Sequence, residues 1–246
     1  MTAPVFVVDH FDAGGGGRYV LDGPEGRHAV SVKRLRAGED VVLTDGAGRW
    51  AECVVVDTEG KDRLIVHMDS VAEEPAAEPR VTVVQALPKG ERGELAVETM
   101  TEVGVDAIVP WAASRCITQW KGDRGAKALA KWRATAREAG KQSRRVRFPE
   151  VADAATSKQV AALLAKADFA AVLHEGGEEP LAAAELPTEG EIMLVVGPEG
   201  GVSPEELSLF AEAGAPAYRL GPSVLRTSTA GTAAAALLLG RTGRWS

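Results

Sequence analysis

The second two thirds of the sequence alternates short apolar runs with helical segments, and this alternation limits the possible folds most. Residues 80–87 ("RVTVVQAL") predict a strand, residues 94–103 a helix with Gly104 at its C-terminal cap, and residues 105–110 ("VDAIVP") a second strand. Parallel strands require a crossover of about this length, usually a helix. We therefore predict an α/β fold built on a parallel sheet for this part of the chain.

The same alternation continues to the C-terminus. We expect a long helix at about residues 124–142, a second helix near residues 157–166, and strands at residues 169–175, 191–196 and 217–221. Ser203, Pro204 and Glu206 have the spacing of a helix N-terminus with a capping box. The Ala- and Leu-rich residues 232–239 are too few to span a bilayer and predict a buried helix.

The first seventy residues are of a different kind. Four strand-like runs ("PVFVV", "VVLT", "WAECVVVD" and "RLIVHMDSV") surround a turn at "DGAG", and residues 28–36 are a helical candidate. The polar, proline-containing "EEPAAEP" at residues 73–79 has the composition of a domain joint. We predict an N-terminal domain at residues 1–72, a linker at 73–79 and a second domain at 80–246.

Two glycine-bearing loops follow predicted strands. Residues 195–207 ("VVGPEGGVSPEEL") and 219–231 ("RLGPSVLRTSTAG") both lead from a strand into a helix. In an open α/β sheet, such loops meet at the carboxyl edge of the strands, where ligands bind. The simpler interpretation of the glycines is a tight turn. Arg226 in the second loop would either bond loop carbonyls or hold an anion.

Charge is distributed unevenly. The chain carries a net charge of −7, yet residues 115–147 contain eleven Lys and Arg against two acids, a local net charge of +9. On the long helix, Leu129, Trp132, Ala136 and Ala139 form an apolar stripe, and a basic stripe flanks it. That basic stripe consists of Arg133, Arg137, Lys141 and Arg144. A solvated face is the alternative, but the near absence of acids favours contact with RNA or phosphate.

Several chemistries are excluded. There is no GxSxG elbow, no GxGxxG after a strand and no complete P-loop, and the four histidines lack metal-ligand spacing, so we expect no metal. The two cysteines form no CxxC pair, and the N-terminal residues have no basic region of the signal-peptide kind. We expect a cytoplasmic protein with no membrane partner.

The two glycine loops together resemble the signature of the SPOUT class of methyltransferases. The resemblance is closest to the RsmE-type family, which methylates N3 of a uridine in 16S ribosomal RNA. Residues 28–40 ("HAVSVKRLRAGED") are similar to the family's PUA-like RNA-binding domain, and residues 87–116 and 131–151 are similar to its central segment. The resemblance implies an N-terminal PUA-like small β-barrel, then a SPOUT α/β domain with a C-terminal trefoil knot.

The resemblance also implies S-adenosyl-L-methionine as cofactor and a homodimer. Three loops would wrap the cofactor, at residues 173–176, 197–201 and 220–227. The residues carried over as cofactor-binding are Leu173, His174, Glu175, Gly176, Gly197, Pro198, Glu199, Gly200, Gly201, Leu220, Gly221, Ser223, Leu225, Arg226 and Thr227. Many members have arginine at Ser223 and glutamate at Ser228, so side-chain roles do not transfer to those two positions.

Uridine N3 must lose its proton before it can attack a methyl group, and a nearby cation favours the ionised base. Arg226 is our first candidate for this role, followed by Arg144 and Arg145; Glu199 is a weaker candidate for the base, since it more simply shapes its loop. Phosphate contacts would come from His28, Lys33, Arg34, Arg36, Arg133, Arg137 and Lys141. The substrate expected is 16S rRNA within the small ribosomal subunit.

Three alternatives remain open at this point. One is a SPOUT enzyme that methylates a ribose 2′-hydroxyl of tRNA or rRNA. Another is an RNA-binding protein that keeps the fold without catalysis. The third is a nucleotide-binding α/β protein unrelated to RNA, which leaves the basic segment unexplained.

Overall fold

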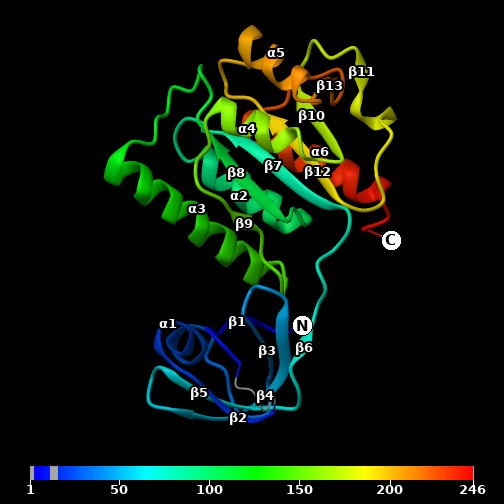
Figure 1. Cartoon of the computed structure of the whole chain (residues 1–246). Helices are drawn as coiled ribbons and strands as arrows, with labels where there is room; N and C mark the ends of the chain where they lie inside the picture. Colours follow the sequence, from blue (N-terminus) through cyan, green and yellow to red (C-terminus); the bar gives the residue numbers. More distant parts are fainter. Residues whose placement is uncertain (1–2, 12–15, 246) are drawn as a thin grey trace. The chain divides into compact units, whose positions relative to one another are not determined.

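The computed structural model describes residues 3–11 and 16–245, which form two compact units (Figure 1). The first unit takes the residues up to Ala76 together with Gly140–Phe148. The second unit takes Ala77–Ala139 and the residues from Pro149 onward. The chain therefore enters the second unit, returns to the first for a short segment, and then completes the second.

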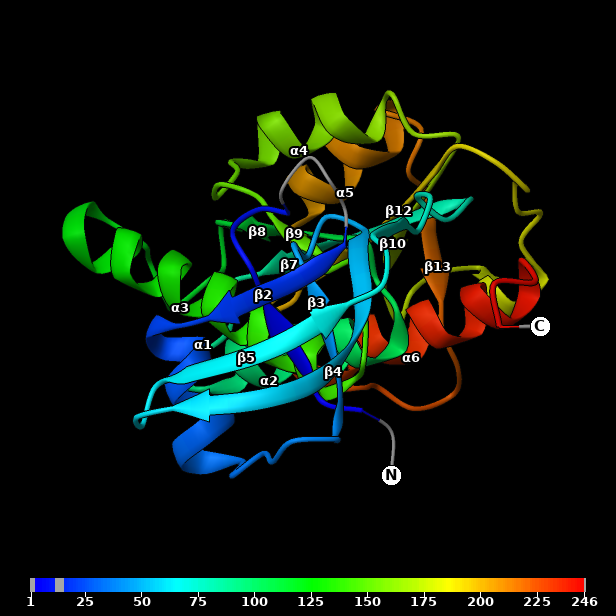
Figure 2. The same cartoon turned by 90° about the horizontal axis from the view of Figure 1, so that it is seen from below.

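The first unit is built on a mixed six-stranded sheet in which the order is β1-β3-β4-β5-β2, with β6 paired to β4. The strands are β1 (Val5–Val7), β2 (Gly17–Leu21), β3 (Asp40–Thr44), β4 (Arg49–Glu59), β5 (Arg63–Met68) and β6 (Ala72–Glu73). Figure 2 shows β2, β5 and β4 running side by side. The predicted β-rich character of this region is confirmed. Its turn at "DGAG" is closed by Asp45, whose carboxylate accepts the N–H groups of Ala47 and Arg49.

The predicted helix at residues 28–36 is wrong in its limits. The helical segment starts earlier, as α1 (Gly23–Arg27), and continues as a π-helical turn over His28–Val32. Pro24 suits the first turn of a helix because it needs no N–H donor there. The segment stops before Arg34, which takes a left-handed conformation with φ of 57°.

The returning segment Gly140–Phe148 is bonded into the first unit. The hydroxyl of Thr44 donates to the carbonyl of Val146 at 2.7 Å, and the N–H of Phe148 donates to the carbonyl of Gly46 at 2.8 Å. These bonds use groups at the end of β3 and in the turn that follows it. The sequence pattern, which assigns this segment to the second domain, does not predict them.

The second unit contains a seven-stranded sheet in which all neighbours are parallel, with the order β11-β13-β10-β12-β7-β8-β9. The strands are β7 (Arg80–Ala86), β8 (Ala107–Trp111), β9 (Glu150–Val151), β10 (Phe169–Leu173), β11 (Glu179–Pro180), β12 (Glu191–Val196) and β13 (Ala217–Arg219). The predicted parallel sheet is therefore confirmed. Its central strands are buried on both faces, as their continuous apolar runs require.

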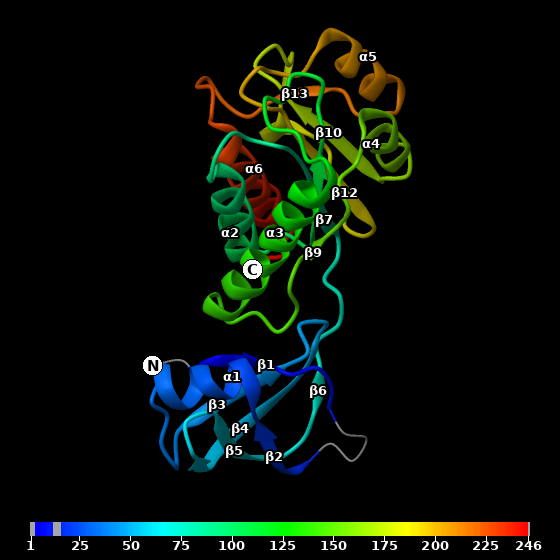
Figure 3. The ribbon, with the colours of Figure 1, turned by 90° about the vertical axis from the view of Figure 1, so that its left-hand side faces the viewer.

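Helices cover both faces of this sheet (Figure 3). One face packs against α2 (Arg92–Val103), α3 (Gly122–Gln142) and α6 (Thr227–Arg241), and the other against α4 (Ser157–Leu164) and α5 (Pro204–Glu212). The apolar stripe predicted for the long helix is confirmed for Trp132, Ala136 and Ala139, which are buried, while Leu129 is partly buried. None of the helices in the described parts of the chain combines the length and apolarity that crossing a membrane requires.

Two predicted helix boundaries are confirmed in detail. Gly104 ends α2 in a left-handed conformation with φ of 107°. Ser203 caps α5: its side chain accepts the N–H of Glu206, and the Glu206 side chain accepts the N–H of Ser203. The second cap fixes the helix that follows the first glycine loop.

Candidate functional site

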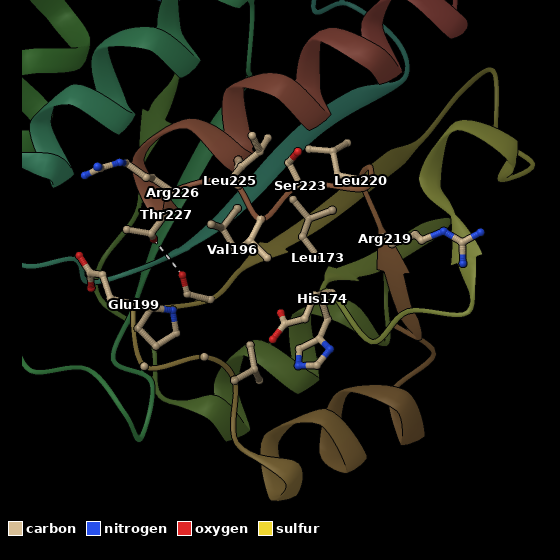
Figure 4. Close-up of a pocket in the computed structure, with 18 of the residues that line it drawn as sticks. Leu173, His174, Val196, Glu199, Arg219, Leu220, Ser223, Leu225, Arg226 and Thr227 are labelled. Carbon is tan, nitrogen blue, oxygen red and sulfur yellow. Dashed lines mark hydrogen bonds between the residues drawn. The ribbon is translucent and has the colours of Figure 1, made fainter.

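A cavity of about 700 Å³ opens at the carboxyl edge of the parallel sheet in the second unit (Figure 4). β12 and β13 both pair with β10, so the three chain segments that follow these strands meet there. We call these segments loop 173–176, loop 197–201 and loop 220–227. The sequence pattern predicts that two of these loops meet, the family resemblance adds loop 173–176, and residues of all three line this cavity.

Nearly all the residues proposed to hold a cofactor line this cavity. They are Leu173, His174, Glu175, Gly197, Pro198, Glu199, Gly200, Gly201, Leu220, Gly221, Ser223, Leu225, Arg226 and Thr227. Gly176 does not line it: its N–H donates to Nδ1 of His174 at 3.0 Å. Gly176 therefore shapes loop 173–176 without contributing to the cavity wall.

Loop 197–201 brings backbone to the cavity, and its glycines are required for two different reasons. A Cβ atom on Gly197 would lie 2.8 Å from Cγ2 of Val202, closer than real Cβ contacts allow. Gly201 has a φ of +74°, which other residues rarely adopt. The two glycines therefore fix the path of loop 197–201 along the cavity.

A buried carboxylate fixes the helix behind this loop. The Glu206 side chain accepts the N–H of Ser114 at 2.8 Å and the hydroxyl of Ser157 at 2.7 Å, in addition to its bond within the cap. Burial raises the pKa of this carboxyl, but the hydrogen bonds from Ser114, Ser157 and Ser203 outweigh it, so the pKa lies below its ordinary value. The α5 N-terminus is thereby tied to β8 and α4 through one ionised group.

The cavity has an apolar wall and a cationic end. Figure 4 shows Leu173, Val196, Leu220 and Leu225 grouped on one side. At the other end the lining includes three guanidinium groups and one carboxylate, those of Arg92, Arg115, Arg226 and Glu199. An apolar wall suits the face of a flat heterocycle, and the excess of cations suits an anion.

Glu199 is occupied by contacts with the segment that follows β7. Its Oε1 accepts the N–H of Lys89 at 3.1 Å and lies 3.7 Å from a guanidinium nitrogen of Arg92. Arg115 donates to the carbonyl of Gly200 at 3.3 Å. Glu199 is therefore held in a structural role, which weakens it as a candidate base.

Arg226 is the N-terminal cap residue of α6. Within residues 3–11 and 16–245, no carboxylate lies within ion-pair distance of its guanidinium, and Figure 4 shows its side chain pointing away from the apolar wall. An unpaired guanidinium at the cavity is free to meet a substrate anion.

Arg92 and Arg115 are cavity residues that sequence reasoning missed. Both follow the carboxyl end of a strand, Arg92 after β7 and Arg115 after β8. Ligands bind at the carboxyl ends of strands in an open α/β sheet, and this rule, which led to the glycine loops, applies equally to β7 and β8. The sequence therefore contained enough information to suggest both residues. They were missed because neither residue stands in a glycine loop.

Arg144 and Arg145, the other predicted catalytic candidates, do not line the cavity. Both belong to the segment Gly140–Phe148 of the first unit. Arg144 is exposed and has a left-handed conformation with φ of 62°, and the N–H of Arg145 donates to the carbonyl of Gly140. Arg226 alone among the three is part of the cavity.

The first unit exposes a group of unpaired cations. Lys33, Arg34 and Arg36 are all exposed, and in the described parts of the chain none of their side chains forms an ion pair. His28 is half-buried, with its ring 5.8 Å from that of Phe6 in an edge-on contact. The three exposed cations therefore offer a phosphate-binding surface, which we call the turn cations.

The prediction that Lys141 contacts RNA is wrong, because its side chain is buried. Its side chain is only 4% exposed, and its ammonium lies 2.9 Å from Oε1 of Glu25. On the same helix, Arg133 is exposed and pairs with Asp153 at 2.9 Å, while Arg137 is half-buried. A buried, paired ammonium is not available to an RNA phosphate, because breaking a buried ion pair is costly.

No metal centre is formed by the described residues, which contain no group of three or more His, Cys, Asp or Glu side chains that could hold an ion. Both cysteines are free thiols. Burial raises the pKa of the Cys53 thiol to about 12, so it stays protonated and unreactive near neutral pH.

Known proteins resemble this chain along its whole length. A family described as "RNA methyltransferase domain" matches residues 75–239, and one described as "RNA methyltransferase PUA domain" matches residues 21–68. The ribosomal RNA small subunit methyltransferase E of Mycobacterium tuberculosis is 46% identical over 250 residues, which cover 100% of this chain and 94% of that protein. The Bacillus subtilis protein of the same name is 27% identical, with 86% of each chain covered.

Solved structures agree in fold. A ribosomal RNA small subunit methyltransferase E from Neisseria gonorrhoeae, bound to S-adenosyl methionine, has a TM-score of 0.85 and 28% identity, with 98% of both chains covered. A methyltransferase from Legionella pneumophila, in complex with the bound cofactor SAM, has a TM-score of 0.86 and 27% identity over 98% of both chains. Both comparisons extend over the two units of this chain.

Proposed function

This chain belongs to the ribosomal RNA small subunit methyltransferase E family, and we propose that it transfers a methyl group from S-adenosyl-L-methionine to N3 of a uridine in the 16S rRNA of the small ribosomal subunit. It is an RNA methyltransferase with an N-terminal PUA domain and a SPOUT-class α/β domain. The observation that carries the proposal is the convergence of loops 173–176, 197–201 and 220–227 on one cavity.

The cavity fits the proposed cofactor in size and in chemistry. Its volume of about 700 Å³ is in the range of small-molecule sites. The apolar wall of Leu173, Val196, Leu220 and Leu225 suits the adenine ring, and the peptide groups of loop 197–201 can pair with its polar edge and with ribose hydroxyls. Gly197 and Gly201 permit the backbone path of this loop, because a Cβ on Gly197 would collide with Val202 and Gly201 has a positive φ.

For this reaction the protein must align the base with the methyl group and stabilise the negative charge of the deprotonated base. When bound, the cofactor supplies a methyl group already activated on a sulfonium sulfur. The chain must hold the uridine base in line with that methyl group and favour loss of the N3 proton. The unpaired guanidinium of Arg226, which lines the cavity, can stabilise the negative charge of the deprotonated base.

RNA binding is assigned to cations outside the cavity. In the first unit the turn cations Lys33, Arg34 and Arg36 would contact phosphates, together with His28. In the second unit the exposed Arg133 would do so, together with Arg137. Such contacts position the RNA without reading its sequence. Selection of one uridine then rests on RNA shape and on a base turned out into the cavity.

We extend the proposal to the assembly and location of the enzyme. The family resemblance supports a homodimer that acts in the cytoplasm, where small ribosomal subunits are made. Light scattering coupled to gel filtration tests the first point: a mass twice the 25.8 kDa of the chain is expected, and a monomer at micromolar concentration would contradict it.

Calorimetric titration with S-adenosyl-L-methionine, followed by transfer of labelled methyl to unmodified small subunits, tests the function. Gly197→Ala should weaken cofactor binding, because its Cβ would lie 2.8 Å from Val202. Gly240→Ala, where nothing lies within 4 Å of the new Cβ, is the matched control and should bind normally. No binding by the wild-type chain, or equal binding by all three proteins, would count against this site.

A further inference from the structure

A buried amide stands just behind the proposed cofactor site. Gln85 lies near the end of β7, directly opposite Val196 of β12, and its exposed fraction is 0%. Its neighbours Val83, Val84 and Ala86 are buried and apolar, as expected of a central parallel strand. A polar side chain is stable there only if its hydrogen bonds are formed inside the protein.

Both donors of the Gln85 amide are used. Nε2 donates to the carbonyl of Ala86 at 3.1 Å and to the hydroxyl of Thr227 at 3.0 Å. The amide oxygen Oε1 is buried, and no donor in the described parts of the chain reaches it. Rotating the amide by half a turn would not give Oε1 a donor at Ala86, because Oε1 would then face the carbonyl oxygen of Ala86.

The amide therefore sets the direction of the Thr227 hydroxyl. That hydroxyl has one proton, and because it accepts from Gln85, the proton is directed to the carbonyl of Gly197, 2.8 Å away (the dashed line in Figure 4). The chain of bonds joins three elements: β7, loop 197–201 and the first residue of α6. Loop 197–201 and the start of α6, which both line the cavity, are therefore joined through this one hydroxyl.

We propose that Gln85 is a positioning residue for methyl transfer, which holds loop 197–201 and the start of α6 at a fixed spacing through Thr227. Gln85 does not line the cavity, so it acts on cofactor and substrate only through this bond chain. Thr227 follows Arg226 in the sequence, so the same series of hydrogen bonds also fixes the backbone position of Arg226. The inference rests on the proposed use of the cavity for S-adenosyl-L-methionine.

The test compares cofactor affinity with thermal stability in a small set of variants. Gln85→Met keeps the volume and removes the donors, so the Kd for S-adenosyl-L-methionine should rise about tenfold. Its melting temperature should hold or rise, since the unpartnered oxygen is lost too. Thr227→Val should weaken binding to a similar degree, and Thr227→Ser, which keeps the hydroxyl, should restore it.

The double variant separates a shared chain from two independent effects. Because both changes break one bond chain, Gln85→Met with Thr227→Val should weaken binding little more than either alone. Thr101→Val is the control: Thr101 is buried and bonded to a helix carbonyl in α2, outside the cavity. It should leave the Kd unchanged.

Distinct results overturn distinct statements. Wild-type Kd and kcat in Gln85→Met, or a lower melting temperature with no change in Kd, would contradict the positioning role. If Gln85→Met does not fold, equal Kd values for Thr227→Val and Thr227→Ser would contradict it instead. Failure of the wild-type chain to bind S-adenosyl-L-methionine would overturn the proposed function itself, and this inference with it.

Discussion

The ammonium of Lys141 lies 2.9 Å from a carboxylate oxygen of Glu25, a residue 116 positions earlier in the chain. Their side chains are 4% and 13% exposed. The pair anchors the returning segment Gly140–Phe148 to α1 within the first unit. A cation that the sequence pattern places on an RNA-binding stripe is therefore part of the interior of the first unit.

Removing one partner of this pair should be costly. Lys141→Ala removes the ammonium from a buried ion pair, and we expect the free energy of unfolding to fall by about 3–5 kcal/mol. Urea denaturation measures this. Lys127→Ala, at an exposed position of the same helix, should change it by less than about 0.5 kcal/mol. Similar losses in both variants would contradict the assignment.

Local sequence signals were sufficient where the cause of a structure is local. Ser203 and Gly104 stand at helix ends that their own chemistry specifies, and both were predicted correctly. Two loops of the cavity, 197–201 and 220–227, were predictable because parallel strands share one carboxyl edge, whereas loop 173–176 came from the family resemblance. Their residues followed from the family resemblance, except that Gly176 lies outside the cavity wall.

The sequence could not show which partners arrive from distant parts of the chain. Helical spacing places Lys141 beside Arg137, but not the Glu25 that it meets. For the same reason the hydrogen bond between Gln85 and Thr227, which are 142 positions apart, cannot be predicted from the apolar pattern of residues 80–87. The trefoil knot implied by the resemblance depends on the path of the whole chain and stays a prediction, because periodicity carries no information on threading.

Glu206 should make stability dependent on acid. Its pKa is below the ordinary value in the folded protein, so its contribution is complete above the unfolded pKa of about 4.3 and is lost as pH falls toward the folded value. Glu206→Gln should cost about 1.5–3 kcal/mol at pH 7 and flatten the loss of stability below about pH 4. Unfolding curves from pH 7 to pH 3 measure both effects.

Glu212→Gln, at an exposed position of the same helix, is the matched control for this prediction. This variant should lose stability between pH 7 and pH 3 in the same way as the wild-type protein. If Glu206→Gln and Glu212→Gln give the same pH profile, the carboxylate that joins α5 to Ser114 and Ser157 contributes nothing specific.

Arg226 should affect turnover far more than cofactor affinity. Arg226→Ala removes the cation proposed to stabilise the ionised base, and kcat should fall by about 10²–10³-fold. Arg226→Lys keeps the charge without the planar group and should recover part of the rate. Single-turnover methyl transfer and calorimetric Kd are the two readouts. Full turnover in Arg226→Ala at unchanged affinity would refute the proposed charge stabilisation.

The turn cations should account for part of the salt dependence of RNA binding. Changing Lys33, Arg34 and Arg36 together to Ala removes three candidate phosphate contacts, so the slope of log K against log salt should decrease by about 2–3. The control is the pair Arg18→Ala and Arg63→Ala, whose guanidiniums already lie against Glu59. Filter binding over a range of salt gives both slopes, and identical slopes would exclude the turn cations as RNA contacts.

The most direct measurement is the identity of the methylated nucleoside. Unmodified small subunits are incubated with the wild-type chain and labelled S-adenosyl-L-methionine, and the rRNA is then digested to nucleosides and separated. Label in 3-methyluridine, incorporated about 10²–10³-fold more slowly with Arg226→Ala, is the predicted result. Label in a 2′-O-methyl nucleoside, or no label although the cofactor binds, would contradict uridine-N3 methylation at this cavity.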